Sequence, residues 1–135
     1  MDPRKLQLRK RTRVLVVDDD LNCRLLVATL LQLEGYATTT AGDGFHALEC
    51  VAAEEPNLIL LDLQMPLLDG CDVLADVRAR NPQARVVIVS GASGAKEQAL
   101  AMGANAFLAK PFDLDALLTT VETVSAASSQ ARGNR

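Results

Sequence analysis

The chain has 135 residues and a net charge of −3, and its 49% hydrophobic and 23% charged residues are typical of an ordinary globular domain. No apolar stretch approaches the roughly 20 residues that cross a bilayer, and the basic N-terminus lacks the apolar segment of a secretory signal. Three widely spaced cysteines and a single histidine argue against a disulfide framework or a structural zinc site. We therefore expect a cytoplasmic protein with no membrane association.

The charge is unevenly distributed along the chain. Residues 1–13 carry six basic side chains and one acid, whereas residues 14–124 carry six basic and sixteen acidic side chains. An acidic core is unlike a nucleic-acid-binding surface, so direct DNA binding is not expected. The basic N-terminal arm, residues 1–12, is expected to be solvated.

Five short apolar segments predict the strands of a sheet. Three of them are continuous rather than alternating, which is typical of strands buried on both faces of a parallel sheet. The second and the fifth are weaker. In chain order the predicted strands are 14–17, 36–41, 58–61, 86–89 and 106–109.

Each predicted strand is followed by a segment typical of a helix. The first four of these segments end at a glycine or before a proline, and the fifth leads into the tail. The predicted helices are 21–34, 44–54, 69–80, 95–102 and 113–124. The remaining residues, 125–135, are rich in serine, alanine and glycine and predict a flexible C-terminal tail.

Strand and helix alternate five times, which predicts an α/β domain over residues 13–124, with a parallel sheet and helices on both of its faces. In such a sheet the functional site lies outside the carboxyl ends of the strands. The residues with useful chemistry at these ends are Asp18, Asp19, Asp20, Asp62, Ser90 and Lys110.

The acids at the strand ends favour a metal site. Asp18, Asp19 and Asp62 would repel one another unless a divalent cation lay between them. Carboxylate oxygens suit Mg²⁺, with Mn²⁺ as a substitute. A carboxylate beside such a metal and beside Lys110 could accept a phosphoryl group. Asp20 is expected instead to cap the following helix.

Four motifs in order carry a family resemblance: VLVVDDD at 14–20, LILLDLQMPLLDG at 58–70, VVIVSG at 86–91 and GANAFLAKPF at 103–112. With them the chain resembles the receiver domain of bacterial two-component response regulators. The resemblance implies a flavodoxin-like, doubly wound (βα)5 three-layer sandwich whose five-stranded parallel sheet has the order 2-1-3-4-5.

The resemblance also implies the acceptor and its metal ligands. Asp62 matches the phospho-accepting aspartate. Asp19, Asp62 and the backbone carbonyl of Gln64 match the direct ligands of Mg²⁺, and Asp18 matches the acid that acts through a water molecule. The receiver would therefore take up its phosphoryl group in a Mg²⁺-dependent reaction.

The last two motifs imply a conformational switch. Ser90 matches the hydroxyl that turns toward the phosphoryl group, and Lys110, before a cis peptide to Pro111, matches the lysine that pairs with it. Phe107 matches the aromatic switch residue, without the hydroxyl of the commoner tyrosine. The interval from Ser90 to Gly103 is short for the family, so the helix within it is expected to be short or irregular.

A receiver implies a signalling role rather than an enzyme acting on a separate substrate: it catalyses only its own phosphorylation and dephosphorylation. Its phosphodonor would be a sensor histidine kinase or a histidine phosphotransfer protein, and its output a conformational change read by a downstream protein partner. We expect a stand-alone receiver rather than an excised domain, monomeric or forming a weak dimer on phosphorylation.

Two other functions use the same residues. In a haloacid-dehalogenase-type phosphatase, Asp18 would be the nucleophile, followed by Asp20, Ser90 and Lys110. However, Asn22 departs from that pattern, and no acidic pair follows the lysine on another strand. A pseudo-receiver that acts without phosphorylation would have lost its acceptor, acids or lysine, and all are present.

Overall fold

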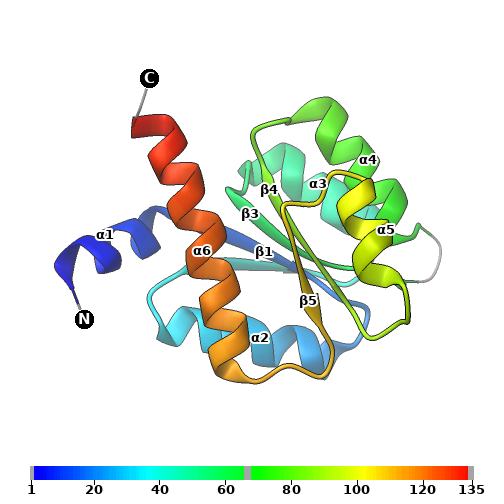
Figure 1. The fold of residues 1–135 in the computed structure, drawn as a ribbon, viewed down its shortest axis with the longest axis horizontal. Coiled ribbons are helices and arrows are strands. Elements are labelled where there is room, and N and C mark those ends of the chain that lie inside the picture. Colours follow the sequence, from blue (N-terminus) through cyan, green and yellow to red (C-terminus); the bar gives the residue numbers. More distant parts are fainter. Residues whose placement is uncertain (1, 66–67, 134–135) are drawn as a thin grey trace.

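The computed structural model describes residues 2–65 and 68–133, which form a parallel sheet covered by helices (Figure 1). Its strands are β1 (Arg13–Val17), β2 (Ala37–Ala41), β3 (Leu58–Asp62), β4 (Arg85–Ser90) and β5 (Ala106–Ala109). Its helices are α1 (Pro3–Arg11), α2 (Leu21–Leu33), α3 (Gly44–Glu54), α4 (Gly70–Arg80), α5 (Ala95–Ala101) and α6 (Leu114–Gly133). The sheet order is β2-β1-β3-β4-β5, all neighbours parallel, which confirms the predicted topology.

The helices cover both faces of the sheet, giving three layers (Figure 1). Successive residues of β3 point to opposite faces. Leu58 and Leu60 join the core cluster beneath α2 and α6, whereas Ile59 and Leu61 join the cluster beneath α3, α4 and α5. All five residues of β3 are buried. The central strands are continuously apolar because neither of their faces meets water, whereas β2 lies at the edge and carries three half-buried threonines.

Aspartate side chains begin the helices that follow β1, β2 and β3. Asp20 accepts hydrogen bonds from two backbone N–H groups of α2, which confirms its predicted capping role, and Asp43 and Asp69 cap α3 and α4 in the same way. By contrast, α5 has only seven residues and begins at Gly94 without a side-chain cap. The prediction of a short helix between β4 and β5 is therefore confirmed.

The N-terminal segment differs from the solvated arm that its charge predicted. Asp2 caps α1, and Pro3 occupies the first turn, where its missing N–H costs nothing. The Arg9 side chain is buried, and it forms ion pairs with Glu34 after α2 and Glu122 on α6. The other basic side chains of the arm are exposed, as its charge predicted, and Arg9 differs because the helix turns it toward the rest of the molecule.

The C-terminal helix also differs from its predicted extent. We expected it to end at Val124, but α6 continues to Gly133. The added segment contains alanine, glutamine and arginine, which favour helix, and no proline interrupts it. Neither α6 nor another helix in the described ranges is long and apolar enough to cross a membrane.

Candidate functional site

The predicted site residues gather at the carboxyl edge of the sheet. Asp18 follows the last residue of β1, Asp62 ends β3, Ser90 ends β4 and Lys110 follows β5. The strand ends lie level because the parallel registers pair Val17 with Leu61, Asp62 with Val89, and Ser90 with Ala109. The Lys110 N–H donates to the Ser90 carbonyl at 3.0 Å, and this hydrogen bond holds Lys110 beside Ser90.

An acidic cluster forms the centre of the site. Carboxylate oxygens of Asp18, Asp19 and Asp62 all lie within 4.8 Å of one another. Asp18 and Asp62 are only 5% and 7% exposed, whereas Asp19 faces the solvent. Each buried carboxylate accepts one backbone N–H: Asp18 from Asp20 at 2.9 Å, and Asp62 from Gln64 at 3.1 Å.

Lys110 provides the positive charge of the cluster. Its Nζ lies 3.0 Å from Oδ2 of Asp18 and 3.5 Å from Oδ2 of Asp62. Partial burial alone would lower the pKa of Lys110, but the hydrogen bond to Asp18 and the charges of both carboxylates outweigh burial and raise the pKa. The lysine is therefore a stable ammonium group that bridges two buried acids.

The two buried carboxyls differ in how well their charge is compensated. Burial raises the pKa of Asp62, and the hydrogen bond from Gln64 and the charge of Lys110 only partly oppose it. Burial also disfavours the charge of Asp18, but hydrogen bonds from the Asp20 N–H, the Cys23 thiol and Lys110 outweigh it and lower the pKa. Asp62 is thus the carboxylate with the greater need of a further positive partner.

A close approach of α4 positions the segment after Asp62. The Leu63 N–H donates to the Val89 carbonyl at 3.2 Å, and the Gly70 N–H donates to the Leu63 carbonyl at 3.1 Å. A Cβ atom at Gly70 would lie 2.6 Å from the Asp62 carbonyl oxygen, so only glycine allows this contact. Pro66, part of the motif that follows the predicted acceptor, lies outside the described residues.

The donor set fits a magnesium ion. The three acids offer hard oxygen ligands, as Mg²⁺ prefers. The exposure of Asp19 leaves one side of the cluster open, which suits an ion that keeps several of its waters. Gln64 has its backbone next to Asp62 and its side chain in solvent, so its chemistry in the site is that of the main chain.

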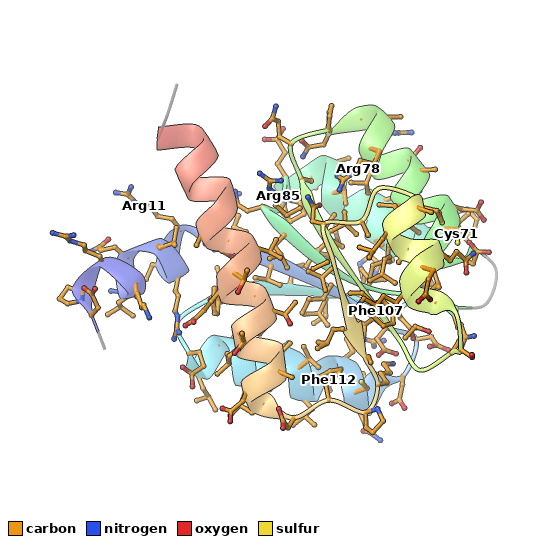
Figure 2. All side chains as sticks on the ribbon, viewed as in Figure 1. Arg11, Cys71, Arg78, Arg85, Phe107 and Phe112 are labelled. Carbon is orange, nitrogen blue, oxygen red and sulfur yellow. The ribbon has the colours of Figure 1, made fainter. Side chains whose placement is uncertain are left out.

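The two predicted switch residues lie at different depths. Ser90 is 2% exposed, and its Oγ accepts the Ala92 N–H at 3.1 Å, which leaves the hydroxyl hydrogen free to donate. Phe107 is half-buried, pairs with Ile88 in the sheet, and packs against the core cluster that includes Ala95 of α5 (Figure 2). Phe107 is therefore part of the packing between β5 and α5 and does not join the acidic cluster.

Sequence reasoning missed two residues on the first turn of α2. The Arg24 Nη1 donates to the Asp18 carbonyl at 2.8 Å, and the Cys23 thiol donates to the Asp18 carboxylate. Burial and the neighbouring Asp18 raise the pKa of Cys23 to about 11, so this thiol is protonated and a poor nucleophile. The sequence did offer one signal for Arg24, because it is a cation six positions after the strand-end acid Asp18. His46, the single histidine, is exposed on α3.

A doubly wound sheet with carboxylates, a lysine and a buried hydroxyl at its carboxyl edge defines a class of phosphoryl-accepting α/β proteins. Comparison with known proteins gives the family. Residues 14–122 match the family described as the response regulator receiver domain. The chain therefore belongs to the receiver domains of two-component response regulators, which act in phosphorylation-dependent signalling and bind Mg²⁺ in an acidic pocket.

Three known proteins illustrate the similarity. Sporulation initiation phosphotransferase F of Bacillus subtilis (strain 168) is 34% identical over 112 residues, which are 82% of this chain and 90% of that protein. Response regulator MprA of Mycobacterium leprae (strain TN) is 33% identical over 114 residues, 83% of this chain but only 50% of MprA. The structure of Vibrio cholerae chemotaxis protein CheY4 superposes with a TM-score of 0.79 at 32% identity, covering 84% of this chain and 98% of CheY4. The chain thus spans nearly all of some relatives and half of others.

Proposed function

We propose that Asp62 is the phosphoacceptor of this receiver. The observation that supports this most directly is the position of its carboxylate: buried, at the end of the central strand β3, and 3.5 Å from the ammonium group of Lys110. Burial raises the pKa of Asp62, so its oxygens are more basic than those of Asp18. A basic carboxylate oxygen beside a fixed cation is suited to attack phosphorus.

The acidic cluster would hold Mg²⁺, or Mn²⁺ in its place. We assign Asp19, Asp62 and the backbone carbonyl of Gln64 as direct ligands, and Asp18 as a ligand through water. When bound, the ion neutralises charge on the phosphoryl oxygens. Because Lys110 pairs with both buried acids, the site is already partly neutralised from one side, and the exposed Asp19 is the ligand through which an ion can enter.

The transfer itself needs little beyond positioning. An Asp62 oxygen forms a bond to phosphorus as the bond between phosphorus and the histidine nitrogen of the donor breaks, and Lys110 pairs with the transferred oxygens. In the structure the Ser90 hydroxyl accepts a hydrogen bond from the Ala92 N–H. On phosphorylation it donates its free hydrogen to the phosphoryl group. The product is the modified protein, so the chain acts as a signalling domain and not as an enzyme with a separate substrate.

We assign Ser90 and Phe107 as the switch. A shift of Ser90 toward the phosphoryl group would release the Ala92 N–H and move the loop that leads to α5. Phe107 packs against the core cluster that includes residues of α5. The space that Ser90 and its loop leave when they shift would therefore be available to the Phe107 ring. The output surface would therefore include α5 and β5, where a downstream protein partner reads the change.

The phosphodonor, a sensor histidine kinase or a histidine phosphotransfer protein, would dock beside α2. A groove of about 400 Å³ opens next to Lys110 between α2 and the start of α6, and its walls include Leu26, Leu30, Phe112 and Leu114. Leu26 is 61% exposed. The groove is continuous with the acceptor site, because Lys110 belongs to both, and a donor helix seated there would bring its histidine to Asp62.

The acceptor is tested by incubation with Mg²⁺ and acetyl phosphate, followed by intact mass measurement. We expect one hydroxylamine-labile phosphoryl adduct in the wild type, none in Asp62→Asn, and none when the metal is chelated. Asp20→Asn is the matched control, since it alters the same acidic run but asparagine still caps α2. It should be phosphorylated at close to the wild-type rate.

The contrary results are distinct. An adduct that persists in Asp62→Asn but is lost in Asp18→Asn would move the nucleophile to Asp18, as in the phosphatase alternative. The absence of an adduct in every variant, together with an absence of Mg²⁺ binding, would identify a pseudo-receiver.

The docking groove is tested with a phosphorylated histidine phosphotransfer domain that transfers to the wild type. Leu26→Ser should slow that transfer about tenfold or more and leave uptake from acetyl phosphate unchanged. Leu33→Ser is the control, because Leu33 is an exposed leucine at the far end of α2. Equal effects of the two substitutions would place the donor elsewhere.

A further inference from the structure

A second pocket lies at the opposite edge of the sheet, where the strands begin. It has a volume of about 580 Å³ and is bounded by α1, α6 and the starts of β3 and β4. Its walls include Arg4, Leu8 and Arg11 from α1, Leu58 and Arg85 from the strands, and Ser125 from α6. Figure 2 shows Arg11 and Arg85 on either side of α6. Nothing in the receiver's phosphorylation chemistry uses these residues.

The pocket concentrates positive charge that is not neutralised. None of its lining residues is acidic, and the guanidinium groups of Arg4, Arg11 and Arg85 form no ion pair within residues 2–65 and 68–133. Arg9, on the same helix, is by contrast paired with two glutamates. Burial, and then the nearby charge of Arg85, lower the pKa of Arg78 on α4.

Two buried polar atoms in the wall lack partners. Ser125 is 6% exposed, and its Oγ makes no hydrogen bond to any residue that the structure describes. The buried Nε of Arg85 is unpartnered within the same residues. Buried polar groups without partners are uncommon in folded proteins.

We propose that this pocket binds a small phosphorylated molecule with an apolar or aromatic body, of the size of a nucleotide. Guanidinium groups recognise phosphate in a bidentate manner and stack on flat rings. The half-buried side chain of Leu8 lines the same space and provides contact for the body. The volume lies within the range of small-molecule sites. A concave pocket favours such a ligand over a nucleic-acid duplex, which presents its phosphates along an extended surface.

The test is calorimetric titration of the full chain with ATP, GMP and pyrophosphate in the presence of a chelator, so that no metal holds a nucleotide at the acidic site. We expect saturable one-site binding of at least one nucleotide, weaker binding of pyrophosphate, and an affinity that falls with salt. Arg11→Gln and Arg85→Gln should each weaken binding by about tenfold or more.

Matched controls separate a site from general charge. Lys10→Gln removes the same charge from α1 without altering the pocket wall, and Arg80→Gln does so on α4. Both should bind like the wild type. If Arg85→Gln does not fold, Arg4→Gln repeats the test at an exposed side chain. Phosphorylation of Asp62 by acetyl phosphate should be unchanged in all of these variants, which separates this proposal from the one above.

Several results would overturn the proposal. These are the absence of saturable binding by either nucleotide, equal losses in the control and pocket variants, or pyrophosphate binding as tightly as the nucleotides. Binding of a duplex RNA more tightly than ATP, with the same dependence on Arg11, would instead make this face a nucleic-acid contact.

Discussion

Asp18 and Asp62 are chemically identical side chains, similarly buried and bound to the same lysine, yet their pKa values move in opposite directions. The difference lies in the donors that each carboxylate receives. Asp18 has the Asp20 N–H, the Cys23 thiol and the closer contact to Lys110. Asp62 has one backbone donor and the longer contact. The residue with fewer donors is the one that gains most from Mg²⁺.

We expect Asp62→Asn to stabilise the metal-free protein at pH 7. Because the pKa of Asp62 is higher in the folded protein, folding favours its protonated form. That contribution to stability is full below the unfolded pKa of about 3.9 and is lost as the pH rises through the folded pKa. Asparagine does not ionise and escapes this loss. The free energy of unfolding, measured with urea in a chelator, should therefore be greater for the variant at pH 7.

The pH series provides the control for this expectation. The difference in the free energy of unfolding between variant and wild type should shrink as the pH falls through the folded pKa toward 4. A variant that is less stable than the wild type at pH 7 would contradict the assignment of an uncompensated carboxylate.

At the scale of single residues, the sequence predicts those site residues whose position depends only on where a strand ends. Asp18, Asp62 and Lys110 were predicted because a parallel sheet brings the residues after its strands to one edge. Cys23 and Arg24 were not predicted, because their contacts depend on which way the first turn of α2 faces. Side-chain direction on a helix is set by packing, which strand-end position does not report.

Among the elements, α1 is joined to the rest of the molecule by the ion pairs of Arg9. Arg9 contacts Glu34 and Glu122, and its guanidinium carbon lies 5.4 Å from the centroid of the Tyr36 ring. These partners belong to the end of α2, to α6 and to the segment before β2. One residue therefore links the N-terminal helix to three other parts of the molecule.

We expect Arg9→Met to destabilise the protein by about 2 kcal/mol. Loss of one partner from a buried ion pair costs roughly 3–5 kcal/mol, and the cost is smaller here because both glutamates remain about a third exposed and stay hydrated. Urea denaturation measures the change, and amide exchange in α1 should become faster. Lys10→Met, at an exposed position of the same helix, should change stability by less than about 0.5 kcal/mol. Equal losses would mean that Arg9 does not anchor α1.

The five strands and the helices α2 to α5 were predicted correctly, because the hydrophobic pattern and the helix-end signals indicate the same elements in these segments. The central strands are continuously apolar, and glycine or proline follows several helices. Both ends of the chain were mispredicted for one physical reason. In α1 and at the end of α6 the composition is polar, so hydrophobic pattern says little, and the outcome depends on a few contacts and on helix propensity.

For the whole molecule, Mg²⁺ binding should act as a stabilising ligand. A ligand that binds only the folded state adds about 2.7 kcal/mol at a free concentration one hundred times its Kd. We expect thermal denaturation to shift upward with Mg²⁺, and Asp19→Asn to lose most of that shift with little change in the metal-free protein, because Asp19 is exposed. An unchanged shift in Asp19→Asn would exclude it as a direct ligand.

The topology could be predicted before any coordinates. Five alternations of strand and helix with short connections leave few arrangements, and the four ordered motifs select one of them. The basic pocket could not be predicted, because it requires α1 to fold back against α6 and the strand starts. Residues from four separate segments make its wall, and none of them forms a motif.

The length of β3 limits how the two ends of the sheet can influence each other. Leu58 borders the basic pocket and Asp62 ends the strand, so the two sites are about 13 Å apart along it. At physiological ionic strength the Debye length is about 8 Å, and both sites open to solvent. The charge of a phosphoryl group would therefore be largely screened at Arg85. Any coupling between phosphorylation and the pocket must then be carried by movement of strands and helices, and it should persist when the salt concentration is raised.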